Sequence, residues 1–139
     1  MLDDISVESV VEDGGSTGRG RITMLRLAWR RDDPLAVVLL LTAEPDHPAL
    51  PRGRWVVLRD FLRYGLEEPT GDGDVRLRPD GSGQRMVIEL VRCGRPASVS
   101  IPADTVQRFL DATEAIVPTG EERSEAALDA LIERLLRSS

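Results

Sequence analysis

The stretch "RWVVLRDFLRYGLEEPTGDGDVRLRP", residues 54–79, combines elements whose order indicates the fold of the whole chain. The β-branched run 54–58 predicts a short strand, because such side chains favour extended backbone. In 59–66 the apolar residues recur on one side of one or two helical turns, which predicts a helix. Alternation over 74–79 predicts a new strand. This succession indicates mixed α and β structure.

A turn joins the helix to the second strand and contains Pro69, Gly71, Asp72, Gly73 and Asp74. Glycine adopts positive φ without steric cost, so these residues predict a tight turn. The alternating acids also raise the hypothesis of a calcium loop. Counted from Asp72, however, the fifth and twelfth positions are an arginine and a glycine, where such a loop needs oxygen ligands. No Gly-Lys-Ser/Thr follows, which argues against a phosphate loop.

The rest of the chain predicts more strands and then helices. Five further strands are predicted from alternation and from apolar runs, at 4–11, 21–29, 35–43, 84–92 and 95–102. Loops rich in glycine or proline are expected at 12–20 and 44–53. About seven strands with helices mainly toward the C-terminus indicate an α+β domain built on an antiparallel sheet. We expect one domain over 1–139, with a loose N-terminal segment within 1–20.

Two helices are predicted after the last strand. The first covers 106–117 and ends before Pro118. The second is an amphipathic helix within 119–139, and Thr119 with Glu122 three residues later has the form of a capping box. Its apolar face consists of Leu128, Leu131, Ile132, Leu135 and Leu136. Such a face is too apolar to remain in water, so we expect it to pack on the domain's own sheet or across a subunit interface.

The composition is that of an ordinary soluble domain. Of the 139 residues, 41% are hydrophobic and 30% are charged, and the net charge is −6. The longest apolar run, 35–41, suits a buried strand better than a membrane span, and the N-terminus lacks a signal-peptide layout. We therefore expect no membrane insertion and a cytoplasmic location. Acids concentrate toward both ends, so 19–108 is mildly basic, which fits a mixed solvated surface or a patch for nucleic acid.

The sequence offers little catalytic or metal-binding chemistry. His47 is the one histidine and Cys93 the one cysteine. A zinc site needs three or four ligands, and a Ser-His-Asp arrangement would have to use a histidine in a proline-rich loop. We expect no enzyme, metal or cofactor site. Trp29, Trp55 and Tyr64 are core residues or stacking platforms for bases, and an aromatic content of 4% favours the core.

Residues 54–79 also resemble the segment that characterises the SsgA-like proteins, sporulation and cell-division regulators of actinobacteria. The matching residues follow in register without a gap and are Trp55, Arg59, Asp60, Leu62, Gly65, Leu66, Pro69, Gly71, Gly73, Asp74 and Val75. A second block, 109–122, resembles a family helix end and a Val-Pro-Leu-Gly sequence, with Pro118 and Gly120 in place. The resemblance implies a Whirly-like subunit, a homotrimer and a non-enzymatic role. That role is to help place the tubulin-like protein FtsZ or other septal machinery at division septa.

The helix at 59–66 is the expected contact surface for such partners. It would present Arg59, Asp60, Arg63, Tyr64 and Leu66, and arginine and tyrosine are common in protein–protein hot spots. This interpretation takes Arg59 and Arg63 to be exposed; the alternative is that Arg59 pairs with an acid on the domain's own surface. The other function left open is single-stranded nucleic-acid binding. The Whirly-like fold suggests it, while the negative net charge and the few aromatic residues disfavour it.

Overall fold

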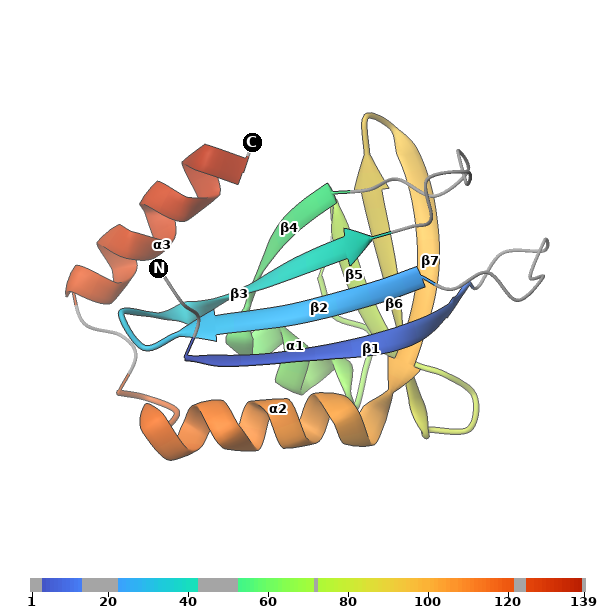
Figure 1. Cartoon of the computed structure of the whole chain (residues 1–139), viewed down its shortest axis with the longest axis horizontal. Coiled ribbons are helices and arrows are strands. Elements are labelled where there is room, and N and C mark those ends of the chain that lie inside the picture. The colour runs from blue at the N-terminus through green and yellow to red at the C-terminus, as the bar shows by residue number, and fades with distance from the viewer. Residues whose placement is uncertain (1–3, 14–22, 43–52, 72, 122–124, 139) are drawn as a thin grey trace.

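A computed structural model describes residues 4–13, 23–42, 53–71, 73–121 and 125–138, which form seven strands and three helices (Figure 1). The strands are β1 (Ile5–Asp13), β2 (Thr23–Arg30), β3 (Asp33–Thr42), β4 (Gly53–Leu58), β5 (Val75–Pro79), β6 (Arg85–Arg92) and β7 (Arg95–Pro102). The helices are α1 (Arg59–Gly65), α2 (Ala103–Ile116) and α3 (Glu125–Ser138). None of the described helices is long and apolar enough to cross a membrane.

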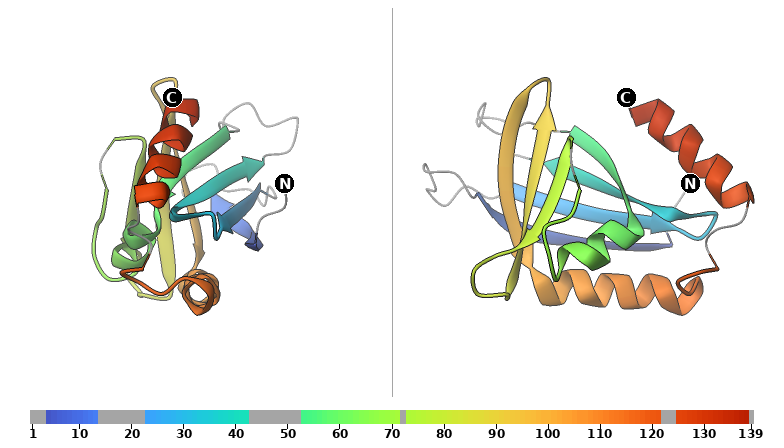
Figure 2. Two further views of the ribbon diagram at one scale, coloured as in Figure 1. Left: turned by 90° about the vertical axis from the view of Figure 1, so that its left-hand side faces the viewer. Right: turned by 180° about the vertical axis from the view of Figure 1, so that it is seen from behind.

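The strands form two antiparallel halves that join at one corner (Figure 2). Their order is β4-β3-β2-β1-β7-β6-β5. Among the described residues, β1 meets β7 only through the pairs Glu12–Ser100 and Asp13–Val99. Helix α1 follows the four-stranded half and α2 follows the three-stranded half. The predicted α+β class is therefore confirmed, with strands preceding a helix in each half.

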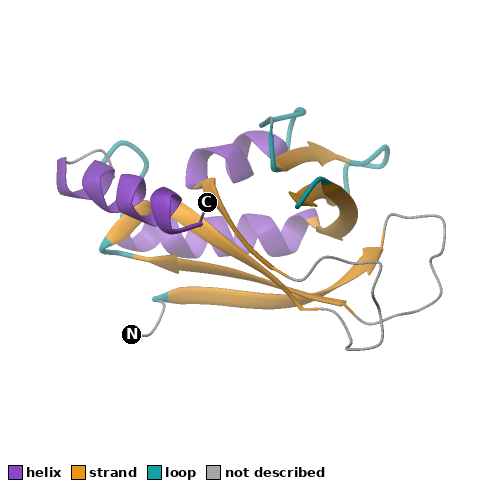
Figure 3. Cartoon of the chain, turned by 90° about the horizontal axis from the view of Figure 1, so that it is seen from above, coloured by secondary structure: helices purple, strands orange, loops and turns teal. Residues whose placement is uncertain are grey.

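The hydrophobic core combines the inner faces of both halves with residues of α1 and α2. In β6, Met86, Ile88 and Leu90 are fully buried while the residues between them are not, which is the period of a sheet with one covered face. In β3, by contrast, every residue from Leu35 to Leu39 is buried. Helix α3 lies against β3 and accounts for this difference (Figure 3).

The C-terminal helix begins later than the sequence predicts. Helix α3 starts at Glu125, whereas the capping-box pattern predicted a start beside Thr119. The hydroxyl of Thr119 instead donates a hydrogen bond to the Glu114 carboxylate at the end of α2. The predicted role of Thr119 as the cap of α3 is therefore wrong, because its side chain is hydrogen-bonded to the preceding helix, α2.

The N-terminal segment is not loose throughout, because Ile5–Asp13 forms β1 and pairs with β2. The rest of the predicted 1–20 segment lies outside the described residues, apart from Asp4. The same holds for residues 44–52 of the loop predicted at 44–53, which include His47.

The turn between α1 and β5 is confirmed. Gly71 has φ 90° and Gly73 has φ 83°, while Asp72 between them lies outside the described residues. A Cβ atom at position 71 would lie 2.7 Å from the carbonyl oxygen of Val75, whereas one at position 73 would meet nothing within 4 Å. The two glycines share a backbone requirement but differ in the space around them.

Replacing Gly71 with alanine should therefore destabilise the protein more than replacing Gly73. Each substitution imposes about 1–2 kcal/mol of strain at positive φ, and Gly71→Ala adds the close contact with Val75. Urea denaturation followed by tryptophan fluorescence measures both free energies of unfolding. Gly81→Ala is the control, because that position has open space and no positive φ. Equal losses at positions 71 and 73 would contradict the close approach.

Candidate protein-interaction surface

Arg59 lies in the core, where only 1% of the residue is exposed. Its guanidinium carbon lies 5.6 Å from the centroid of the Trp29 ring, and Nη1 donates a hydrogen bond of 3.3 Å to Thr113 Oγ1 on α2. The ring face and the hydroxyl stabilise a charge that is held away from water. The expectation that Arg59 is exposed is therefore wrong, because α1 begins against the core and this side chain reaches α2.

Arg63 also connects α1 to α2, and Asp60 pairs with Arg63 within α1. Arg63 Nη1 lies 2.7 Å from Asp60 Oδ1, and Arg63 Nη2 lies 3.1 Å from Glu114 Oε1. These side chains are 16% to 33% exposed, so solvent screens them less than it screens surface pairs. Among the predicted contact residues, Tyr64 is the exposed one, with 51% of the residue accessible to solvent. Leu66 is half-buried against the core.

Both tryptophans are core residues, as the low aromatic content predicts. Trp29 Nε1 donates to the Pro34 carbonyl oxygen, and Trp55 Nε1 donates to the Val91 carbonyl oxygen, each at 3.0 Å. Trp29 is 1% exposed and Trp55 is 6% exposed. Stacking on nucleic-acid bases requires exposed rings, so neither tryptophan can serve as a platform.

The remaining motif residues shape the backbone. A Cβ atom on Gly65 would lie 2.6 Å from Leu77 Cβ, so glycine lets α1 approach β5. The carbonyl oxygen of Asp74 accepts a hydrogen bond of 2.9 Å from the backbone N–H of Val91 in β6. Gly120 has φ 98° in the exposed turn that follows α2. These contacts position α1 and the turn and do not by themselves provide a binding site.

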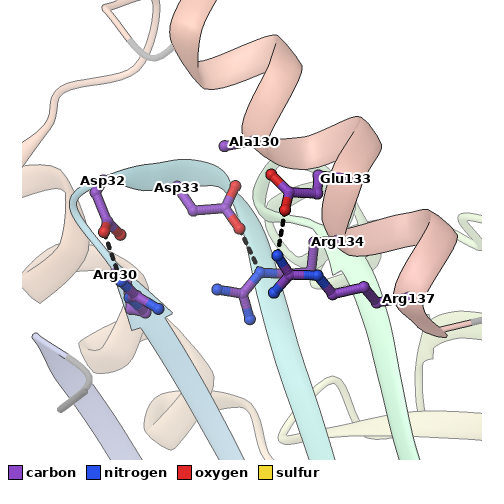
Figure 4. A pocket seen from close by; sticks show the side chains of 7 residues that line it. All are labelled: Arg30, Asp32, Asp33, Ala130, Glu133, Arg134 and Arg137. Atoms are coloured by element: carbon purple, nitrogen blue, oxygen red, sulfur yellow. Dashed lines mark hydrogen bonds and ion pairs between the residues drawn. The ribbon is translucent and has the colours of Figure 1, made fainter.

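Polar side chains of α3 lie beside the turn between β2 and β3 (Figure 4). A cavity of about 220 Å³ separates α3 from the β2–β3 turn and is lined by Arg30, Asp32, Asp33, Ala130, Glu133, Arg134 and Arg137. Arg134 Nε donates a hydrogen bond to Asp33 Oδ2, and the side chain of Asp33 is only 6% exposed. Sequence reasoning missed this pair, because 101 residues separate its members and no local pattern links them.

The charges around this cavity are paired. Arg30 contacts Asp32, and Arg137 contacts Glu133 one helical turn away. Burial lowers the pKa of Arg54 on β4, and the nearby arginines of α3 lower it further. The contact between α3 and the rest of the domain therefore includes charged pairs, beside half-buried Ala130 and Leu131.

The apolar side of α3 points away from the sheet. We call this surface the outer face of α3; it comprises Leu128, Ile132, Leu135 and Leu136, which are 42%, 56%, 45% and 71% exposed. Leu131 is half-buried. The domain's own sheet does not cover these four side chains. This exposure argues against packing of the apolar face on the domain's own sheet, which was one of the two arrangements expected from the sequence. An exposed apolar patch of this kind is typical of an interaction surface.

Comparison with known proteins connects this fold to cell division. The profile of the family described as "Streptomyces sporulation and cell division protein, SsgA" matches residues 23–122, which run from β2 to beyond α2. The sporulation-specific cell division protein SsgB of Kineococcus radiotolerans is 33% identical over 126 residues, or 87% of this chain and 73% of that protein. SsgB of Streptomyces coelicolor is 41% identical over 87 residues, or 61% of this chain and 64% of that protein.

Two solved structures share the arrangement of strands and helices. An SsgA-like sporulation-specific cell division protein from Thermobifida fusca is 26% identical, with a TM-score of 0.74 over 94% of this chain and 93% of that chain. A structure described with mutations in SsgB that correlate to longitudinal cell division during sporulation of Streptomyces coelicolor is 32% identical. Its TM-score is 0.73, over 85% of this chain and 91% of that chain. The likeness extends well beyond the motif in 54–79.

Charge reversal at the two arginines of α1 should have unequal effects. Arg59→Glu places a carboxylate in a buried site, and an uncompensated buried charge costs about 3–5 kcal/mol. Arg63→Glu alters partly exposed pairs and should cost about 1 kcal/mol. Guanidinium denaturation measures both losses, with Arg108→Glu on the exposed side of α2 as the control. Similar midpoints for Arg59→Glu and Arg63→Glu would show that Arg59 is not buried as described.

Proposed function

Because the chain belongs to the SsgA family of sporulation and cell division proteins, we propose that it acts in sporulation-specific cell division as a non-enzymatic interaction protein. In this proposal it holds division proteins together and helps to localise them at septa from the cytoplasm. The single observation that carries the proposal is the outer face of α3, an apolar surface that the domain itself leaves uncovered.

Covering the outer face of α3 would be favourable. Its four side chains are 42% to 71% exposed. Removing apolar surface from water contributes about 25 cal/mol per Å², so covering one half-exposed leucine contributes about 1 kcal/mol. Four such side chains on one helix together favour association with a second apolar surface over exposure to solvent.

We assign the outer face of α3 to self-association, with a homotrimer as the expected assembly. Leu128, Ile132 and Leu135 recur at intervals of four and three residues, which is the spacing of helices that pack along one another. A second copy offers the same face and is therefore a complementary partner. The resemblance to SsgA-like proteins supplies the expectation of threefold assembly.

The contact with the division machinery forms the second part of the proposal. The family resemblance implies FtsZ or other septal proteins as partners. On α1, Tyr64 remains available at 51% exposed, beside half-buried Leu66, whereas Arg59 no longer belongs to this surface. Tyrosine is enriched in hot spots because it combines a large apolar ring with a polar group.

Replacing Ile132 and Leu135 together with serine should convert the oligomer into a folded monomer. Both side chains are exposed, so the fold should remain while the apolar contact is lost. Multi-angle light scattering measures the mass against the 15.3 kDa of one chain. Asp129→Ser is the matched control, because it changes an exposed polar position on the same helix. In sporulating hyphae, a fluorescent fusion of the parent should gather at septa and the double variant should not.

The parts of the proposal fail separately. If the parent chain is monomeric at micromolar concentration, the proposed self-association is wrong. If the fluorescent fusion of the parent chain never reaches septa, the proposed role in division is wrong. Tyr64→Ala should reduce recruitment to septa and leave the mass of the oligomer unchanged. Normal recruitment of this variant would contradict α1 as a contact surface.

A further inference from the structure

Helix α3 buries few of its side chains against the rest of the domain. Within 128–137, where the side chains of α3 are described, Ala130, Leu131 and Arg134 are half-buried and all others are exposed. Helix α2 also has 14 residues, and four of them are buried. An element with few buried contacts opens at a lower free energy than the core around it. We therefore expect α3 to leave the sheet more readily than α2.

The contact between α3 and the β2–β3 turn is incompletely packed. The cavity of about 220 Å³ lies in this contact. Asp33 accepts a hydrogen bond from Arg134 through Oδ2, but Oδ1 is enclosed and has no hydrogen-bond partner within the described residues (Figure 4). A void and a buried acceptor without a partner both reduce the stability of a contact. The bond between Asp33 and Arg134 therefore has to offset unfavourable features of the contact that it makes.

The Asp33–Arg134 pair differs from the other ion pairs around this cavity in its burial. Its two side chains are 6% and 18% exposed. Two further ion pairs line the same cavity, Arg30–Asp32 and Arg137–Glu133. Each of these includes a side chain that is at least 60% exposed, and exposed pairs contribute little to stability. Asp33 and Arg134 are therefore the two residues through which the docking of α3 can be changed without touching its outer face.

We propose that the docking of α3 and the self-association of the chain are coupled. The Asp33–Arg134 pair holds α3 in the position that assembly requires, and assembly in turn keeps α3 docked. This coupling rests on the proposed self-association through the outer face of α3. In a single subunit α3 opens often, and each subunit that joins the assembly has its α3 held from both sides. Asp33 and Arg134 are thus positioning residues for assembly, although neither belongs to the outer face.

The coupling follows from the ordering that association requires. An open helix must become fixed before its apolar side chains form one surface, and this ordering lowers the affinity. When the competent position is occupied for a fraction of the time, the apparent dissociation constant rises in inverse proportion to that fraction. The loss applies to every α3 that takes part in the interface. Because coupling between two equilibria is reciprocal, assembly must also slow the opening of α3.

A dilution series of the full-length protein, followed by multi-angle light scattering, tests the first direction of this coupling. Asp33→Asn and Arg134→Gln should each raise the apparent dissociation constant of the assembly at least about tenfold. Arg134→Lys keeps the charge and a donor, so it should stay closer to the parent than Arg134→Gln. Asp32→Asn and Arg137→Gln are the matched controls, because they make the same chemical changes in the more exposed pairs of the same cavity. Both controls should assemble like the parent.

Hydrogen exchange of the parent at two protein concentrations tests the reverse direction. One concentration lies below and one above the point at which the assembly forms. We expect the α3 amides to exchange at least about tenfold more slowly in the assembly, while exchange in α2 stays the same. Exchange of α3 that is equally fast in both states would overturn the coupling even though the assembly forms.

The results separate the coupling from self-association itself. If the parent assembles and both Asp33→Asn and Arg134→Gln assemble equally well, the coupling is wrong and self-association stands. If the parent is monomeric at every concentration, self-association is wrong and the coupling fails with it. Should Asp33→Asn not fold, as fast exchange in α2 would show, Arg134→Gln still gives the result, because no described side chain of α3 belongs to the buried core.

Discussion

The ion pair between Asp33 and Arg134 determines the orientation of the C-terminal helix and so the surface that the molecule presents. Asp33 begins β3, and its side chain is only 6% exposed, so its carboxylate would be costly without a partner. Arg134 supplies that partner from the polar side of α3. The pair thus holds the polar side of the helix against the sheet and leaves the outer face of α3 in solvent.

The burial of Arg59 changes how the family motif in 54–79 is understood. Arg59 and Arg63 join α1 to α2, and Gly65 lets α1 approach β5. Their contacts are internal, so this part of the motif serves the fold. The surface proposed for self-association lies elsewhere, on the outer face of α3.

Local patterns predict the elements of this protein better than the contacts between them. The strands and the turn at Gly71 and Gly73 were predictable, because alternation and positive φ leave clear signals in the sequence. The start of α3 was not, since the capping-box pattern at Thr119 is equally compatible with a turn that serves α2. Arg59 resembles a surface residue because arginine is rarely buried, and its partner Thr113 is 54 residues away. Long-range contacts of this kind leave no periodic signal.

Hydrogen exchange of the α3 amides tests most directly whether the Asp33–Arg134 pair holds this helix in place. Asp33→Asn and Arg134→Gln should each speed exchange across α3 by about tenfold or more, equivalent to about 1.4 kcal/mol, while α2 is unaffected. The double variant should exchange no faster than either single variant, because both substitutions break the same contact. Parent-like exchange in both single variants, or additive effects in the double variant, would show that α3 is held by other contacts and would contradict this account.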